Sequence, residues 1–294
     1  MRVVLYTLCW NDFSRLQFFF RHYDNFVTRY VIYDDGSDEP TLDVLRRHPN
    51  VEIRRFKRSH PDSFVLSEQS ISNTCWKECR ADADWVIVTD IDEHLWHPNM
   101  TAYLERNLRR GVTVIPALGF QMIHDVVPPV TADLSEVVTR GMPWSEMMKL
   151  SIFNPKAIAE INFGIGRHKA FPTGNVVLPK SDELLLLHYK YLGFNETFAR
   201  HHNQFAGLGP IDIEMNWGNQ YWQTLETHRK LWDHYSLHAV DYRHFSKGSH
   251  IDQFPVPRWW RWPAPWSLIL PDAWLLNWIR TKEWISRNIN RNRS

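Results

Sequence analysis

The feature that most constrains this chain is a short apolar run that ends in acidic residues. Trp85 to Thr89 is rich in β-branched residues, and it is long enough for a buried strand but too short for a free-standing helix. Asp90 and Asp92 follow it, and residues two apart in an extended backbone face the same side. Two carboxylates held that close repel unless a hard divalent cation lies between them, and oxygen ligands suit Mg²⁺ or Mn²⁺. The plainer alternative is an acidic loop that precedes a helix near Pro98.

Strand-like and helix-like segments alternate from the start of the chain to this run. Strands are predicted at 2–8, 30–33, 51–56 and 85–89, and helices at 13–26, 41–48 and 67–79. This alternation indicates an α/β fold with a mostly parallel sheet flanked by helices. The carboxyl ends of parallel strands meet at one edge. The turns Asn11-Asp12, Asp34-Asp35 and Asp90–Asp92 should therefore lie side by side.

The patterns after residue 100 are less regular. Further strands are predicted at 112–123, 149–153, 157–161 and 184–187, with helices at 101–110, 195–202 and 216–235 and a loop or lid at 124–146. Pro116 should mark a bend or an edge, because proline cannot donate to a strand ladder. The apolar run Leu184 to Leu187 ends at His188.

Composition excludes several classes of protein. The chain has 294 residues, 44% hydrophobic and 23% charged, as in a soluble globular protein. Its net charge of +1 gives no support for nucleic acid as a partner. Cys9, Cys75 and Cys79 form neither a zinc motif nor an even-numbered disulfide framework, so a reducing, cytoplasmic location is expected. The apolar stretch Val3–Trp10 stops at once in polar residues, which favours a first strand over a signal peptide.

Residues 206–294 are predicted to form a helical extension rich in tryptophan and proline, after a catalytic domain at 1–205. Seven of the fifteen tryptophans lie between Trp259 and Trp284. The segment Trp262–Ile279 contains Asp272 and three prolines, so it does not suit a membrane-spanning helix. Two interpretations remain: peripheral contact with lipid headgroups at the inner face of the membrane, or packing of the tryptophans on the catalytic domain.

Four motifs, in this order, resemble those of glycosyltransferases with the GT-A fold, close to the family-2 type. They are Asn11-Asp12, Asp34-Asp35-Gly36-Ser37, the stretch Trp85–Glu93, and His188-Tyr189. The resemblance covers about residues 1–205. It implies a GT-A (Rossmann-like) catalytic domain that moves a sugar, with inversion, from a nucleoside-diphosphate sugar to a glycan or lipid-linked acceptor. A UDP-sugar is the favoured donor, and polysaccharide biosynthesis is the implied setting.

The resemblance also implies roles for single residues. Asp35, or its neighbour Asp34, would accept a hydrogen bond from the nucleobase edge. Asp90 would hold the ribose or a metal-bound water, and Asp92 would ligate the cation. His188 would add a neutral imidazole ligand, which Mn²⁺ accepts better than Mg²⁺ does. Asp90, Asp92 and His188 together form the expected metal site.

Further donor-site candidates lie in the same motifs or close to them: Asn11, Asp12, Gln69, Asn73, Glu93 and Lys190. Lys190 would neutralise the departing diphosphate, although a solvated surface lysine is an equal alternative. Gln69 and Asn73 are one helical turn apart, near the expected sugar position. Alternatively, they are only the polar face of their helix.

The catalytic base is not identified by the motifs. An inverting transferase needs a group that takes the proton of the acceptor hydroxyl, and the candidates are His168, Glu146 and Asp125. Three rival functions stay open. A sugar nucleotidyltransferase would carry a glycine-rich loop near its N-terminus, and the 8–12 segment has no glycine. The others are a non-catalytic carbohydrate-binding or nucleotide-binding protein and a metal-dependent hydrolase.

Overall fold

The computed structural model describes residues 1–245 and 254–261. The chain divides into two units, Met1–Pro257 and Arg258–Ser294, so the first unit continues beyond the predicted boundary at 205. In the second, the rings of Trp259 and Trp260 meet edge to face with centroids 5.3 Å apart. The predicted tail segment Trp262–Ile279 lies outside the described residues. Within the described part, no helix is both long and apolar enough to cross a bilayer.

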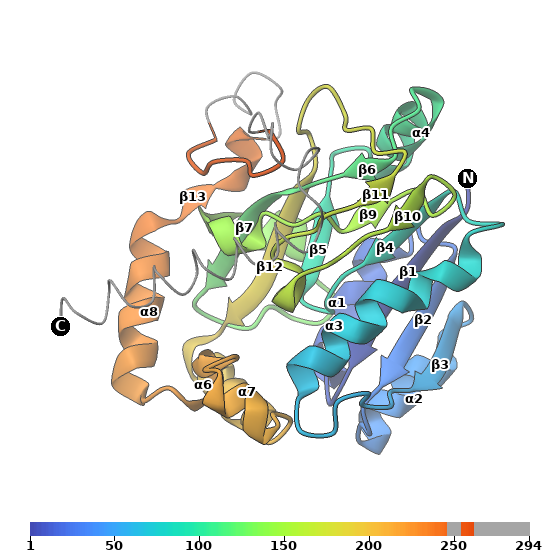
Figure 1. Cartoon of the computed structure of the whole chain (residues 1–294). Helices are drawn as coiled ribbons and strands as arrows, with labels where there is room; N and C mark the ends of the chain where they lie inside the picture. Colours follow the sequence, from blue (N-terminus) through green and yellow to red (C-terminus); the bar gives the residue numbers. More distant parts are fainter. Residues whose placement is uncertain (246–253, 262–294) are drawn as a thin grey trace, which may run out of the picture. The chain divides into compact units, whose positions relative to one another are not determined.

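The first sheet has a parallel core, as the alternating pattern predicts (Figure 1). Its strands, in spatial order, are β3 (Val51–Arg55), β2 (Arg29–Asp34), β1 (Val3–Cys9), β4 (Trp85–Val88), β9 (Ile152–Phe153) and β6 (Val114–Ile115). The first four strands run parallel, whereas β9 pairs antiparallel with both of its neighbours. The carboxyl ends of β1, β2 and β4 therefore share one edge.

Helices cover both faces of this sheet (Figure 1). They are α1 (Phe13–Tyr23), α2 (Glu39–Arg47), α3 (Phe64–Thr74) and the 3-10 helix η1 (Cys75–Cys79). Leu5 of β1 packs in one apolar cluster with Leu16 and Phe19 of α1. Tyr6 points to the other face, where its hydroxyl donates to Glu78 of η1 at 3.0 Å. Successive side chains of β1 thus point to opposite faces of the sheet, and each face is covered by a helix.

A second, mixed sheet lies beyond β4. Its strands, in spatial order, are β13 (Val240–Asp241), β8 (Arg140–Pro143), β7 (Leu118–His124), β12 (Leu185–Leu192) and β5 (Glu93–Trp96). β7 and β12 run parallel and the other pairs antiparallel. Pro116 divides the predicted strand 112–123 into β6 and β7, because proline lacks the N–H that a ladder needs. β12 is longer than predicted and carries His188 within its ladder.

The remaining elements surround these sheets. They are α4 (Met100–Arg109), α5 (Leu134–Val137), η2 (Ser145–Met147), β10 (Ile158–Glu160), η3 (Ile165–Arg167), β11 (Thr173–Gly174), α6 (Phe194–Phe205), α7 (Pro210–Glu214), η4 (Asn219–Trp222), α8 (Leu225–His238) and η5 (Tyr242–His244). The predicted loop 124–146 in fact contains α5 and β8. The predicted helix 216–235 is interrupted, because Gly218 is left-handed (φ 70°) and Gln223 is extended.

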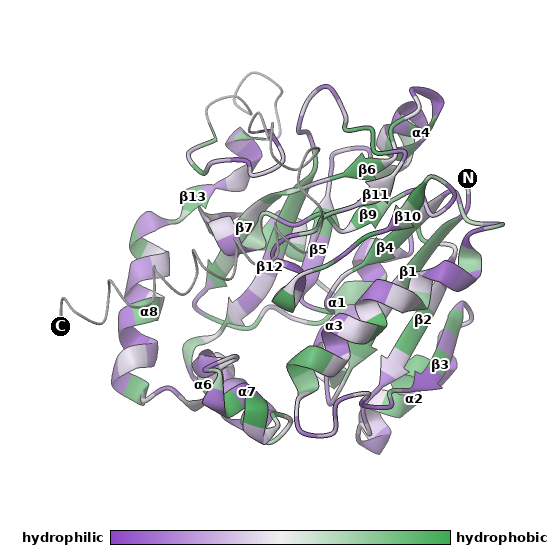
Figure 2. Cartoon of the chain, viewed as in Figure 1, coloured by the Kyte–Doolittle hydropathy of each residue, from purple (hydrophilic) through white to green (hydrophobic). Residues whose placement is uncertain are grey.

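Apolar residues concentrate along the central strands, while helices such as α4 and α8 carry mixed colours (Figure 2). In α8, Tyr235 packs on Tyr191 of β12 with ring centroids 4.8 Å apart. The architecture confirms the expected fold class, a Rossmann-like, GT-A-type α/β fold with mixed sheets flanked by helices.

Candidate active site

Hydrogen bonds tie together the turns that follow β1 and β2. Asn11 is left-handed (φ 53°), and its side-chain oxygen accepts from the Asp38 N–H at 2.8 Å. Its own N–H donates to Ser37 Oγ at 3.0 Å. Asp34 accepts from the Ser37 N–H within its own turn. Asp35 instead forms an ion pair with Arg58, Nη2 to Oδ2 2.7 Å. The two predicted turns are thus neighbours, and Asp35 presents a paired carboxylate there.

Asp92, in the turn after β4, and His188 of β12 come together and are both buried, with 8% and 6% of their surfaces exposed. Asp92 Oδ1 lies 3.6 Å from His188 Nε2. The other ring nitrogen, Nδ1, is 2.9 Å from Gln121 Oε1. The Gln121 amide nitrogen donates to the carbonyls of Met122 and His188, so Oε1 must face the ring. Because Oε1 only accepts, Nδ1 carries the proton, and in the neutral imidazole Nε2 offers its lone pair to the side of Asp92.

This pair fits a divalent cation. A separation of 3.6 Å is too long for a hydrogen bond, yet it suits two ligands on one ion with bonds of about 2.1 Å. Among the described residues, no three His, Cys, Asp or Glu side chains gather as a metal site. A complete protein cage is not needed, since Mg²⁺-type sites commonly use one or two protein ligands and the phosphates of the substrate.

Arg200 of α6 links two of the predicted acidic residues. Its Nη1 lies 3.2 Å from Asp92 Oδ2, and its Nη2 lies 2.8 Å from Asp12 Oδ1. Burial alone would raise the pKa of Asp92, but a protonated His188 together with Arg200 and Arg15 holds it well below its usual range; beside a neutral His188 only the two guanidinium groups act in that direction. The carboxylate of Asp92 is therefore ionised and ready to bind a cation.

Asp90 belongs to a different network, which is centred on the buried Arg167, although the Asp90 side chain itself is 41% exposed. Arg167 is 2% exposed; its Nη2 lies 2.8 Å from Asp90 Oδ2 and 3.2 Å from Glu93 Oε2, and its Nη1 pairs with Glu68. Lys149 Nζ approaches Glu93 Oε1 at 2.5 Å. Asp90 is paired with Arg167, so of the three predicted metal ligands Asp92 and His188 are the two whose side chains face each other.

Glu93 was predicted as a donor-binding residue, but the structure puts it in the interior with 1% exposure. Burial would raise its pKa, whereas Lys149 and Arg167 hold it below the usual range. A buried carboxylate that is paired twice in this way supports its neighbours, and its donor-binding role stays a prediction.

Gln69 and Asn73 of α3 also bind the protein itself. Both side-chain amides donate to the carbonyl of Phe163, at 2.9 and 3.1 Å. The Phe163 N–H donates back to Asn73 Oδ1 at 2.7 Å. These contacts fix the segment that leads to Arg167. The two residues, predicted near the sugar, therefore anchor the segment between Phe163 and Arg167, the residue that pairs with Asp90.

The three candidates for the catalytic base lie in different surroundings. His168 Nδ1 is 2.6 Å from the carbonyl oxygen of Glu146 and 3.7 Å from its carboxylate. Burial, with a smaller contribution from Lys149, lowers the pKa of His168. Asp125 is exposed in the segment after β7. Only His168 and Glu146 contact one another, at the side of the site where Arg167 lies.

Lys190 of β12 completes a group of cations near Asp92. Its ammonium lies 4.9 Å from the ring centroid of Tyr221 in η4. Burial lowers the pKa of Lys190 to about 8. The Arg15 guanidinium donates to the carbonyls of Tyr189 and Lys190. Arg15 thereby fixes the strand that carries both His188 and Lys190.

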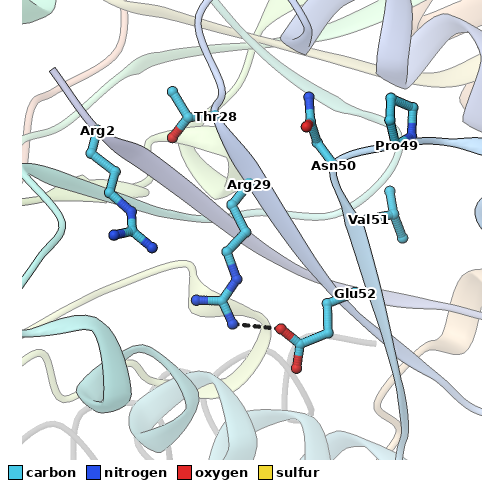
Figure 3. A pocket seen from close by; sticks show the side chains of 7 residues that line it. All are labelled: Arg2, Thr28, Arg29, Pro49, Asn50, Val51 and Glu52. Atoms are coloured by element: carbon cyan, nitrogen blue, oxygen red, sulfur yellow. Dashed lines mark hydrogen bonds and ion pairs between the residues drawn. The ribbon is translucent and has the colours of Figure 1, made fainter.

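One surface hollow is not part of this site. It has a volume of about 460 Å³, and it lies at the amino ends of β2 and β3 (Figure 3). Arg29 and Glu52, which line it, form an ion pair of 2.5 Å. The acidic turns follow the opposite, carboxyl ends of these strands, so the hollow and the candidate site occupy different edges of the sheet.

Sequence reasoning missed the basic partners Arg58, Lys149, Arg167 and Arg200. Arg167 had a local signal, because it directly precedes His168, one of the candidates for the base. Arg200 had none, since it stands 108 residues from Asp92. The acidic motifs were visible as local patterns, whereas their counter-ions come from elsewhere in the chain.

An α/β fold of this type serves many functions, so the class of the protein comes from comparison with known families. The model of glycosyltransferase family 92 matches residues 8–220, which is more than half of the chain. The protein therefore belongs to glycosyltransferase family 92. The expectation of a glycosyltransferase is confirmed, while the family that matches is 92 and not the family-2 type that the motifs resemble.

Similar solved structures are distant. TarS of S. aureus is 12% identical, with a TM-score of 0.29 over 44% of this chain and 23% of its own. Residues 1–349 of TarS, in complex with UDP, are 11% identical, with a TM-score of 0.31 over 53% of this chain and 47% of that chain. A third structure is that of glucosyl-3-phosphoglycerate synthase of Mycobacterium tuberculosis, in complex with Mn²⁺, UDP and glucosyl-3-phosphoglycerate. It is 14% identical, with a TM-score of 0.28 over 40% of this chain and 44% of that chain. This chain spans less than half the length of each. A search of curated proteins finds no match.

Proposed function

We propose that this protein is a metal-dependent glycosyltransferase that uses a nucleoside-diphosphate sugar, with UDP-sugar favoured, and an acceptor that is a glycan or a lipid-linked saccharide. The observation that carries this proposal is the pair Asp92–His188. An ionised carboxylate and an imidazole lone pair face each other 3.6 Å apart, at the sheet edge where α/β folds bind ligands.

A divalent cation bound there, Mn²⁺ or Mg²⁺, would neutralise the diphosphate as it leaves. Among the protein groups, Arg200 and Lys190 supply positive charge beside Asp92, where preorganised cations stabilise a developing anion. Asp35 and the adjoining turn of Asn11 lie on the β2 side, which suits the nucleobase and ribose.

Among the three candidates for the base of an inverting reaction, His168 is favoured on geometry, whereas the lowering of its pKa by burial works against proton uptake. A backbone carbonyl only accepts, so the 2.6 Å contact to the Glu146 carbonyl requires the proton on His168 Nδ1. Nε2 is then unprotonated and available to take the proton of an acceptor hydroxyl. Glu146, 3.7 Å from the ring, would stabilise the imidazolium that results. Asp125 remains a candidate without such a partner.

A cytoplasmic location is part of the proposal. Cys9, Cys75 and Cys79 are free and buried, as suits a reducing compartment. The proposed peripheral contact of the tryptophan-rich tail with the inner face of the membrane concerns residues that lie mostly outside the described part.

The function is tested with Asp92→Asn. We expect loss of Mn²⁺-dependent turnover of a sugar nucleotide by at least about 100-fold, because the variant removes a charged ligand at the reacting diphosphate. Turnover is measured over a panel of UDP-, GDP- and other sugar nucleotides, and folding by cooperative thermal melting. Asp43→Asn, at an exposed carboxylate of α2, is the matched control. Equal turnover in Asp92→Asn and the parent protein would remove the metal assignment.

A further inference from the structure

Arg200 occupies the position of a counter-ion within the proposed metal site. Its guanidinium binds Asp92 with one nitrogen and Asp12 with another. Asp92 Oδ1 faces His188, whereas Oδ2 faces Arg200. The carboxylate that would bind a cation is therefore shared with a cation of the protein itself.

The charges around Asp92 affect how strongly a divalent cation can bind there. Arg15, Lys190 and Arg200 surround Asp12 and Asp92, and these five groups by themselves carry an excess of one positive charge. A divalent cation alone would raise the excess to three charges in a largely buried site, where such repulsion is poorly screened. A sugar nucleotide carries two negative charges on its diphosphate. The cation and the diphosphate together would return the excess to one.

We propose that Arg200 is a resident counter-ion of Asp92 that is released when a divalent cation and a diphosphate enter together, and that its guanidinium then binds the diphosphate. This inference rests on the proposed function and deepens it. Planar guanidinium groups bind carboxylate and phosphate oxygens with the same fork geometry, so Arg200 can exchange one partner for the other. Through this exchange, the protein would bind the cation weakly until the diphosphate is present.

Arg167 does not suit this role, although it also pairs with an acidic residue of the motif. Its side chain is 2% exposed and is held by three carboxylates, those of Glu68, Asp90 and Glu93. The side chain of Arg200 is 20% exposed and extends from the surface helix α6. Removing Arg167 from its carboxylates would leave several buried charges unpaired. Release of Arg200 affects two carboxylates, those of Asp12 and Asp92, and the incoming cation takes its place beside Asp92.

The test compares Mn²⁺ alone with a Mn²⁺–pyrophosphate complex as probes of the full-length protein. Mn²⁺ binding is followed by loss of the EPR signal of the free ion, and binding of the complex by calorimetry. We expect Arg200→Gln to bind Mn²⁺ alone on the order of tenfold more tightly than the parent, because the competing charge is gone. The same variant should bind the complex on the order of tenfold more weakly. A change of opposite sign for the two probes is not expected of a merely structural residue.

Two variants control this comparison. Arg200→Lys keeps the charge, so it should bind Mn²⁺ alone as weakly as the parent and retain most of the affinity for the complex. Arg46→Gln removes an exposed arginine of α2 and should match the parent with both probes. If Arg200→Gln does not melt cooperatively, Arg200→Met, which keeps the aliphatic stem, takes its place.

Two results would overturn the proposal. One is Mn²⁺ affinity in Arg200→Gln that is no higher than in the parent. The other is undiminished affinity of that variant for the complex. Asp92→Asn distinguishes failure of the counter-ion role from failure of the metal site. If this variant binds both probes as the parent does, the metal site and the proposed function fail too. A failure confined to the Arg200 variants removes only the counter-ion role.

Discussion

Arg167 shows how one residue can be forced into an unusual conformation by what its side chain binds. It is left-handed, with φ 54°, a region that non-glycine residues rarely adopt. Gly166 before it is left-handed as well, with φ 60°. The two consecutive turns direct the guanidinium into the interior toward Asp90. Strain of about 1–3 kcal/mol at such a residue persists only where the surroundings determine it, and here three carboxylates do so.

A pH dependence of stability is expected from His22 of α1. Its Nε2 lies 2.8 Å from the Leu95 carbonyl, and its ring stacks on that of His94 with centroids 4.6 Å apart. Burial lowers the pKa of His22 to about 4, below the unfolded value of about 6.5. Between these values the unfolded chain binds more protons. The free energy of unfolding should therefore fall as the pH decreases from about 6.5 to about 4, by roughly 1 kcal/mol per pH unit from this residue.

The measurement is urea unfolding at a series of pH values for the parent and His22→Phe, which keeps a stacking ring but cannot take a proton. The variant should show a shallower loss of stability on the acid side, whatever its stability at neutral pH. Identical slopes for the two proteins would mean that His22 does not titrate differently in the folded and unfolded states.

At the scale of elements, Asp212 fastens α7 to the start of α3. Its side chain is fully buried, and it accepts from the N–H groups of Phe64, Val65 and Gly209. A carboxylate at a helix N-terminus satisfies free donors and complements the helix dipole. We expect Asp212→Ala to lower the free energy of unfolding by roughly 2–3 kcal/mol, because buried N–H groups lose a charged acceptor.

This expectation is checked by chemical denaturation, with Asp212→Asn as the matched variant. Asn keeps one carbonyl oxygen at the same place, so its loss of stability should be smaller than that of Ala. A change below about 0.5 kcal/mol for Asp212→Ala, the size of an ordinary surface substitution, would show that α7 and α3 are held together by other contacts.

The parallel strands and their acidic turns could be predicted because both are local patterns. Asp90 and Asp92 follow an apolar run, and the side that they share is fixed by the strand period. The roles of Glu93 and Gln69 could not be predicted in the same way. Glu93 looked like part of the acidic motif, but Lys149, which pairs with it inside, lies 56 residues away. The amide of Gln69 binds a carbonyl 94 residues away. Such partners are decided by packing, which a single sequence does not display.

At the scale of the whole molecule, segments after residue 205 cover parts of the second sheet. Trp232 and Tyr235 of α8 form a buried cluster with Ile123 and Tyr191. Phe254 meets the ring of Phe120 in β7 with centroids 5.4 Å apart. These aromatic contacts bury large apolar areas, which dominate core energetics. Residues of α8 and Phe254 thus contribute to the core of the same unit as the proposed active site.

The last prediction concerns two truncated chains, 1–205 and 1–257. The shorter chain lacks Asp212 and α8, so the start of α3 loses its acceptor and Tyr191 loses its aromatic cover. We expect it to melt without a cooperative transition and to bind a dye that reports exposed apolar surface. The longer chain keeps the complete unit Met1–Pro257 and should melt cooperatively. The two are compared by calorimetry and dye fluorescence. A sharp, cooperative transition of 1–205 would instead support the boundary that the sequence predicts, with 206–294 as a separate extension.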